Sequence, residues 1–118
     1  DDEITFSKDA NNNVSINLDN KGNIFVLGAA VSYYSLTGAE GQFPIVTSGV
    51  KRLSFMNATS NSTAAVSTRI QFSVPGNGLV AIGIGSNMYE IISITSTTMT
   101  LRTIGVDGNA WYQMFKVK

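Results

Sequence analysis

The chain has 118 residues, carries eight basic and eight acidic side chains, and contains neither histidine nor cysteine. This length fits a single domain with one core, and the balanced charge argues against the basic surface that binds nucleic acid or anionic membranes. Without cysteine and histidine, the chain can form no disulfide, thiolate nucleophile, Cys/His zinc site or serine–histidine triad.

Short stretches rich in Ile, Val, Thr, Phe and Tyr recur along the chain, and apolar and polar residues alternate within them. This period of two is typical of β-strands, whereas helical periodicity is hard to find. The strands are expected, in chain order, at residues 3–7, 14–19, 23–28, 43–47, 51–56, 68–74, 79–84, 89–94, 98–104 and 110–117. The sequence therefore predicts one all-β domain over residues 1–118, an antiparallel barrel or flattened sandwich of eight to ten strands with at most a short helix.

The connections between these strands are mostly short and rich in Gly, Asn, Asp and Ser, which favour tight turns. Because a loop of a few residues cannot make a parallel crossover, the strands at 89–94, 98–104 and 110–117 are expected to form an antiparallel meander. Two longer segments, 29–42 and 57–67, interrupt the pattern. Long loops in compact domains tend to be mobile or functional. The first segment contains two tyrosines, and the second contains almost nothing that packs.

Alternation also assigns the side chains of each strand to two faces. The last strand places Trp111, Phe115 and Val117 on one face and Tyr112 on the other. We expect Trp111 to fill the core near one end, with its ring N–H reaching a polar partner, and Tyr112 to point outward. The other alternating positions predict a core that includes Ile4, Phe6, Ile16, Leu18, Leu53, Phe55, Ile70, Phe72, Met99, Leu101 and Phe115.

The C-terminal part carries a specific pattern: Tyr-Glu-Ile at 89–91, Ser-Ile-Thr at 93–95, Met-Thr-Leu-Arg at 99–102, a Gly-Asn turn at 108–109 and Ala-Trp-Tyr at 110–112. Together with the opening "DDEITFSKD", this pattern resembles the lipocalin-like C-terminal domains of surface glycan-binding lipoproteins of Bacteroidota polysaccharide-utilisation loci. The resemblance covers the two ends of the chain. It implies a lipocalin-like fold, a location that is extracellular or at the outer-membrane surface, and a module that is excised or C-terminal in a larger exported protein.

Sugars bind to proteins through two features, the apolar face of the ring, which lies on aromatic side chains, and hydroxyls, which pair with planar polar groups. The chain offers both kinds of residue. The candidate ligand-binding residues are Tyr33, Tyr34, Tyr89, Tyr112, Trp111, Glu90, Arg102 and Asn109. Two structural alternatives remain open: the paired tyrosines pack down their own loop, and Glu90 and Arg102 form an exposed cross-strand pair.

We expect a non-catalytic carbohydrate-binding domain that captures a polysaccharide or oligosaccharide at the cell surface, with a β-glucan as one candidate. A glycoside hydrolase would need two facing carboxylates, and the sequence brackets no such pair, so no catalytic residue is expected. The sequence has no DxDxDG-type loop with a closing glutamate, and neither a metal nor a cofactor is expected. The other expected partners are further domains of the same protein, and no membrane-spanning segment is expected in this chain. The alternatives are a structural spacer without a ligand and a carrier that holds a small hydrophobic ligand inside a barrel.

Overall fold

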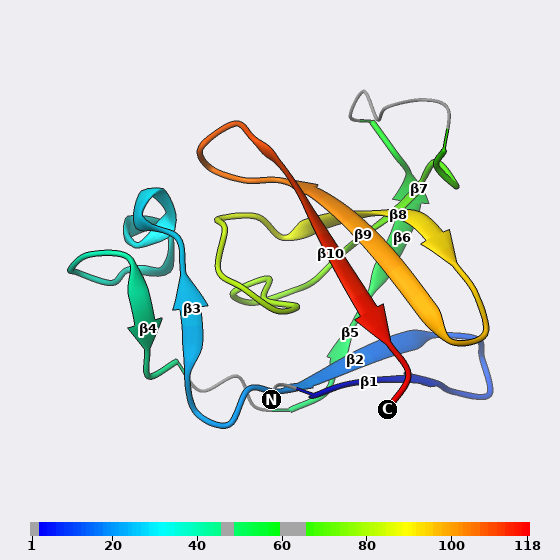
Figure 1. Ribbon diagram of the computed structural model, residues 1–118. Coiled ribbons are helices and arrows are strands. Elements are labelled where there is room, and N and C mark those ends of the chain that lie inside the picture. The colour runs from blue at the N-terminus through cyan, green and yellow to red at the C-terminus, as the bar shows by residue number, and fades with distance from the viewer. Residues whose placement is uncertain (1–2, 46–48, 60–65) are drawn as a thin grey trace.

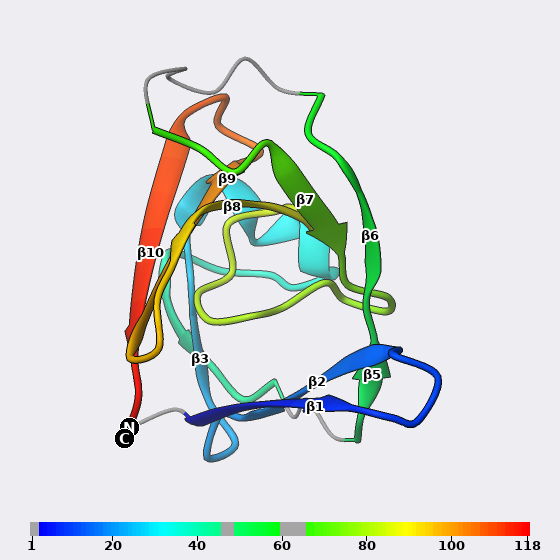
Figure 2. The same ribbon diagram turned by 90° about the vertical axis from the view of Figure 1, so that its right-hand side faces the viewer.

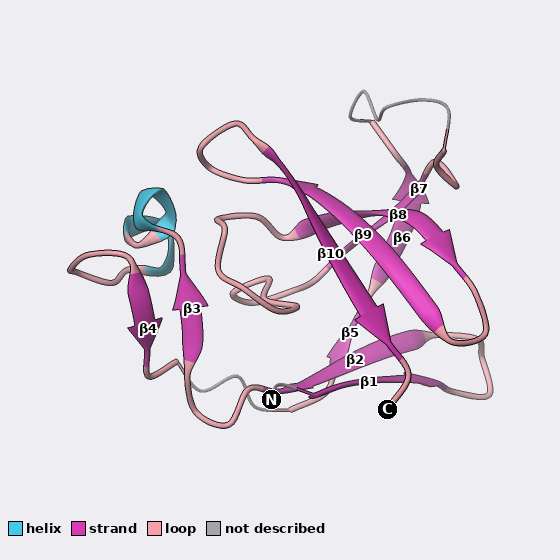
Figure 3. Cartoon of the chain, viewed as in Figure 1, coloured by secondary structure: helices cyan, strands magenta, loops and turns pink. Residues whose placement is uncertain are grey.

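The computed structural model describes residues 3–45, 49–59 and 66–118. Over these residues the chain is all-β, with ten strands and two single 3₁₀ turns (Figures 1 and 3). The elements are β1 (Glu3–Lys8), β2 (Val14–Asp19), β3 (Ile24–Val26), η1 (Gly28–Ala30), η2 (Ser32–Tyr34), β4 (Gly41–Phe43), β5 (Lys51–Arg52), β6 (Ser54–Asn57), β7 (Ile70–Ser73), β8 (Met88–Ile94), β9 (Thr98–Ile104) and β10 (Ala110–Lys116). No helix among the described residues has the length and apolar character needed to cross a membrane.

The strands form three antiparallel sheets. Their strand orders are β1-β2-β5, β10-β9-β8-β7-β6 and β3-β4. The predicted C-terminal meander is confirmed, because β8, β9 and β10 are consecutive antiparallel neighbours. Strands β10 and β6 are the two outer strands of the largest sheet, so the described chain does not form the closed barrel that was one expected alternative.

The two larger sheets are joined by one stretch of chain. Strands β5 and β6 follow each other with only Leu53 between them, and Figure 2 shows them running down one side of the molecule. The backbone N–H of Leu53 donates to Val14 O at 2.9 Å, so the chain is still held to β2 where it leaves the smaller sheet. The single strand expected at 51–56 is therefore divided between two sheets.

Aspartate side chains build the turns of the β1–β2 and β9–β10 hairpins. Asp9 Oδ1 accepts hydrogen bonds from the backbone N–H groups of Asn11 and Asn13, at 2.8 and 2.9 Å. Asp107 Oδ1 accepts the Asn109 N–H at 3.0 Å in the turn between β9 and β10. These hydrogen bonds favour the ionised carboxylates and hold the pKa of both aspartates below its usual value.

The buried side chains form two adjoining clusters. The first lies under the five-stranded sheet and consists of Ile16, Leu53, Phe72, Val74, Val80, Tyr89 and Leu101. The second lies around β3 and the 3₁₀ turns and consists of Leu18, Ile24, Val26, Ala30, Val31 and Leu79. The half-buried Ile4 packs against both clusters and links them.

Part of the predicted core is confirmed and part is wrong. Five of the predicted residues are buried, namely Ile16, Leu18, Leu53, Phe72 and Leu101. Phe6, Phe55 and Ile70 instead keep 40%, 48% and 44% of their surface exposed. Phe6 and Phe55 lie on β1 and β6, which are outer strands with a neighbour on one side only, so little chain covers these rings.

The apolar stretch 79–84, expected as a strand, belongs to no sheet. It crosses the interior irregularly, with Leu79, Val80 and Ile84 fully buried. Its only strand-like contact is one parallel bridge between Gly83 and Val26. The strand expected at 43–47 is also displaced: β4 ends at Phe43, and 46–47 lie outside the described residues.

Candidate functional site

A pocket of about 390 Å³ lies beside the second 3₁₀ turn. It is lined by Tyr33, Tyr34, Ser35, Ile45, Gly76 and Asn77, and we call it the tyrosine pocket. The two neighbouring tyrosines named from the sequence both line it, although they come from the segment 29–42 that was expected to be a long loop. The side chains of consecutive residues in a 3₁₀ turn point about a third of a turn apart. The two adjacent rings therefore meet at an angle and do not lie parallel.

The two rings have different roles in the pocket wall. They lie edge to face, with centroids 4.9 Å apart and an interplanar angle of 77°. Tyr34 is half-buried and its hydroxyl accepts a hydrogen bond from the Gly85 N–H at 3.0 Å, whereas Tyr33 leaves 47% of its surface exposed. Burial raises the pKa of Tyr34, so this hydroxyl stays neutral at physiological pH. Tyr34 therefore acts as a fixed support for the accessible ring of Tyr33.

Asn77 adds a polar side chain to the lining of the tyrosine pocket. Its Oδ1 accepts two hydrogen bonds, from Lys51 Nζ at 2.7 Å and from the Leu79 N–H at 3.1 Å. The flanking Gly76 and Gly78 have φ values of 70° and 74°, a region that glycine enters without strain, and they turn the chain at this point. Because both bonds fall on the oxygen, the Nδ2 donors of Asn77 have no partner among the described residues.

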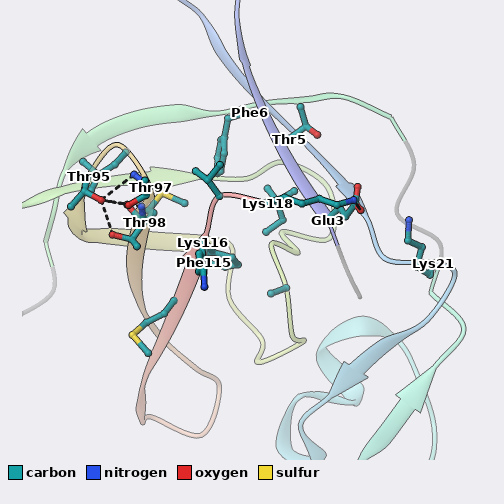
Figure 4. Close-up of a pocket in the computed structure, with 16 residues that line it drawn as sticks. Glu3, Thr5, Phe6, Lys21, Thr95, Thr97, Thr98, Phe115, Lys116 and Lys118 are labelled. Atoms are coloured by element: carbon teal, nitrogen blue, oxygen red, sulfur yellow. Dashed lines mark hydrogen bonds and ion pairs between the residues drawn. The ribbon is translucent and has the colours of Figure 1, made fainter.

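A larger groove of about 930 Å³ lies between β1 and the ends of β9 and β10 (Figure 4). Its apolar lining includes Ile4 and Phe6 of β1, Met99 of β9 and Phe115 of β10. All four were expected in the core, because alternation marks an apolar face without showing whether another layer covers it. None of the residues predicted for ligand binding lines this groove.

The polar residues of the groove lie around this apolar surface. Thr95 and Thr97 lie in the turn between β8 and β9, Thr98 begins β9, and Figure 4 shows the hydrogen bonds that link them. The hydroxyls of Thr95 and Thr98 are 2.7 Å apart, and the Thr97 N–H donates to Thr95 Oγ1 at 3.2 Å. Lys118 and Glu3 form an ion pair and hydrogen bond that join β1 to the end of the described chain.

Tyr89, predicted to bind ligand, is a core residue. Its ring is fully buried and stacks on Phe72, with centroids 5.6 Å apart. Its hydroxyl donates to Gly78 O at 2.6 Å, and burial raises the pKa of the phenol. A ring covered on both faces offers no surface to a sugar, so the assignment of Tyr89 to the binding site is wrong.

Glu90 and Arg102 are register partners on β8 and β9, as predicted, but they are not exposed. Glu90 Oε1 lies 3.1 Å from Arg102 Nη1, and the two side chains expose only 2% and 8% of their surface. Ser67, which precedes β7, donates its hydroxyl to Glu90 Oε2 at 2.6 Å. The expectation of an exposed pair is therefore wrong, and these buried charges are structural rather than available to a ligand.

Trp111 and Asn109 belong to the turn between β9 and β10. The indole N–H of Trp111 donates to the two carboxylate oxygens of Asp107, at 3.2 and 3.3 Å, which confirms the predicted polar partner. Asn109 Nδ2 donates to Asp107 Oδ2 at 3.1 Å. Trp111 is half-buried and belongs to neither core cluster, so it fastens the turn instead of filling the core.

Tyr112 points outward from β10, as expected, and exposes 49% of its surface. It stands opposite Arg102 in the register and lines neither the tyrosine pocket nor the groove described above. Its ring is accessible, but it lies apart from Tyr33 and Tyr34 of the tyrosine pocket.

A scan against protein-family models finds no match to this chain, and a search of curated proteins finds none either. Both hollows have volumes within the ordinary range of ligand pockets. Within residues 3–45, 49–59 and 66–118 no group of acidic side chains is arranged to hold a metal ion. The tyrosine pocket combines an accessible aromatic ring with amide donors, whereas the groove is mainly apolar.

Proposed function

We propose that this chain is a non-catalytic carbohydrate-binding domain that holds a sugar residue in the tyrosine pocket. The observation that carries the proposal is the exposed Tyr33 ring, supported edge to face by Tyr34, beside the amide of Asn77. A pyranose presents C–H groups that pack on an aromatic face and hydroxyls that pair with amide donors. The pocket supplies one surface of each kind.

The pocket is held in place before a ligand arrives. The Tyr34 hydroxyl is anchored to the backbone at Gly85, and the Asn77 amide is oriented by Lys51 and Leu79. Side chains that are already ordered lose little conformational entropy on binding, which favours affinity. These contacts support a preformed sugar site.

The proposal extends to the setting of the domain. The β8, β9 and β10 meander contains most of the residues on which the resemblance to lipocalin-like glycan-binding domains rests. On that basis we propose that the chain is a surface-exposed module that captures a polysaccharide, with a β-glucan as one candidate. Catalysis is not proposed, since the tyrosine pocket is lined by no carboxylate among the described residues. A glycoside hydrolase would place two there.

Tyr33→Ala tests the proposal, with Tyr112→Ala as a matched control. The two tyrosines are almost equally exposed, at 47% and 49%, so both changes should leave the melting temperature nearly unchanged. In calorimetric titration with a panel of β-glucans, α-glucans, mannans and pectins, Tyr33→Ala should weaken binding by about tenfold to a hundredfold. Loss of binding in Tyr112→Ala alone would place the site on β10, and no binding to any glycan would favour the spacer.

A second candidate function, transport of a small apolar ligand, is favoured by the groove. Phe6 exposes 40% of its surface there, beside Ile4 and Phe115. A carrier should copurify with an apolar molecule, and Phe6→Gln should reduce the amount recovered. Protein that carries no such molecule and binds no long-chain fatty acid in titration would leave the groove without this role.

A further inference from the structure

A cation lies directly beside two of the residues that line the tyrosine pocket. Lys51, the first residue of β5, places its ammonium nitrogen 2.7 Å from Oδ1 of Asn77. The position that a Cβ atom would take at Gly76 lies 3.7 Å from the same nitrogen. Gly76 and Asn77 both line the pocket, so the ammonium group adjoins the space that a ligand would occupy.

This ammonium group has no counterion within the described part of the chain. The ion pairs there join Lys21 to Asp19, Lys118 to Glu3 and Arg102 to Glu90. The one hydrogen bond of the Lys51 side chain goes to a neutral amide. An ammonium group has three donors, so two remain for a ligand.

The surroundings of Lys51 make an anionic partner favourable. The side chain is half-buried, and desolvation lowers the pKa of its amine, with no carboxylate of the described residues opposing that shift. A cation that has lost part of its hydration without gaining a counterion is stabilised when an anion binds. Screening by salt is also weaker at a partly buried site than on an open surface.

We infer that the tyrosine pocket selects an acidic sugar, a hexuronate residue whose ring lies on Tyr33 and whose carboxylate pairs with Lys51. This inference rests on the proposed carbohydrate-binding function and names its ligand class. The pieces are complementary: the aromatic ring contacts the apolar ring face, the Nδ2 donors of Asn77 meet a hydroxyl, and the ammonium group meets the carboxylate. The charge-assisted hydrogen bond to the carboxylate is stronger than one to a neutral hydroxyl.

The experiment compares each acidic polysaccharide with its own carboxyl-reduced form, which differs only in the charged group. Polygalacturonate, alginate and xanthan, each intact and reduced, are titrated into the protein by calorimetry at low salt. At least one intact polymer should bind about tenfold more tightly than its reduced form, the effect of one charge-assisted hydrogen bond. Lys51→Met should abolish this preference, so that the intact polymer and its reduced form bind with equal affinity.

Two further variants keep the result interpretable. Lys51→Arg retains the charge and should retain the preference, whereas Lys116→Met removes an equal charge from the groove and should not affect it.

Equal loss of preference in Lys51→Met and Lys116→Met would show general electrostatic attraction and overturn the inference. Equal binding of intact and reduced polymers would also overturn it while leaving the proposed function standing. No binding of any intact or reduced polymer, or of the neutral glycan panel, would instead overturn the proposed function.

Discussion

Replacing Glu90 by glutamine should lower the free energy of unfolding by about 3–5 kcal/mol, because it removes the negative half of a buried ion pair. The Glu90 and Arg102 side chains expose 2% and 8% of their surface and are joined at 3.1 Å. Glutamine keeps the shape of the side chain and can still accept the Ser67 hydroxyl bond, so the change isolates the charge. On an open surface the same pair would contribute about 1 kcal/mol or less.

The assay is urea unfolding followed by circular dichroism, with Asp19→Asn as the control. Asp19 pairs with Lys21 at 2.7 Å, but the two side chains are more than half exposed. The free energy of unfolding of this control should therefore hardly change. A double variant, Glu90→Leu with Arg102→Met, should recover much of the lost stability, since a well-packed apolar pair needs no counterion. If Glu90→Gln unfolds within about 1 kcal/mol of the parent, the pair behaves as a surface pair and the reasoning is refuted.

Three further predictions concern the core, alkaline pH and the β9–β10 turn. Phe72→Ala should lower the free energy of unfolding, measured in urea, by about 3–5 kcal/mol. Phe6 faces the groove, so Phe6→Ala should lower it by less than about 2 kcal/mol. Equal losses would contradict the assignment of Phe6 to the groove and not to the core. Burial raises the pKa of Tyr89, so the folded chain keeps this proton when the unfolded chain releases it, and stability should fall as the pH rises above 10.0, the ordinary value. Unfolding measured against pH should show a shallower alkaline loss for Tyr89→Phe than for the parent. Trp111→Ala should lower the free energy of unfolding by about 1–3 kcal/mol, less than the loss of a buried aromatic residue. Trp111→Phe keeps an aromatic ring but removes the hydrogen bond to Asp107, so it distinguishes the two contributions. If Trp111→Ala fails to fold, Trp111 is a core residue after all.

Features that depend on neighbouring residues were predictable from the sequence. Alternation and short polar turns predicted the β8, β9 and β10 meander and paired Glu90 with Arg102 in register. The same rules predicted that Tyr112 points outward and that the Trp111 N–H finds a polar partner. In each case the deciding interactions lie within one hairpin, so the local chain contains the information.

The candidate site shows where local information ends. Tyr33 and Tyr34 were named from the sequence because aromatic side chains bind sugar rings, but the partners that complete the pocket are distant in the chain. Lys51 and Asn77 are 26 residues apart, and the Tyr34 hydroxyl meets a backbone group 51 residues further on. No periodicity or motif links such positions.

Burial was likewise decided by tertiary structure. Alternation separates two faces of a strand, but whether a face is covered depends on which segments pack against it. Phe6 stays partly exposed because β1 is an outer strand beside the groove. Glu90 and Arg102 are buried, and the Glu90 carboxylate accepts a hydrogen bond from Ser67, 23 residues earlier in the chain. The sequence by itself therefore determined most of the strands, the short turns and the pairing of near neighbours, which follow from backbone geometry and side-chain period. Only the packing of distant segments decided which apolar faces form a core, which charges lose water, and which side chains meet in a pocket.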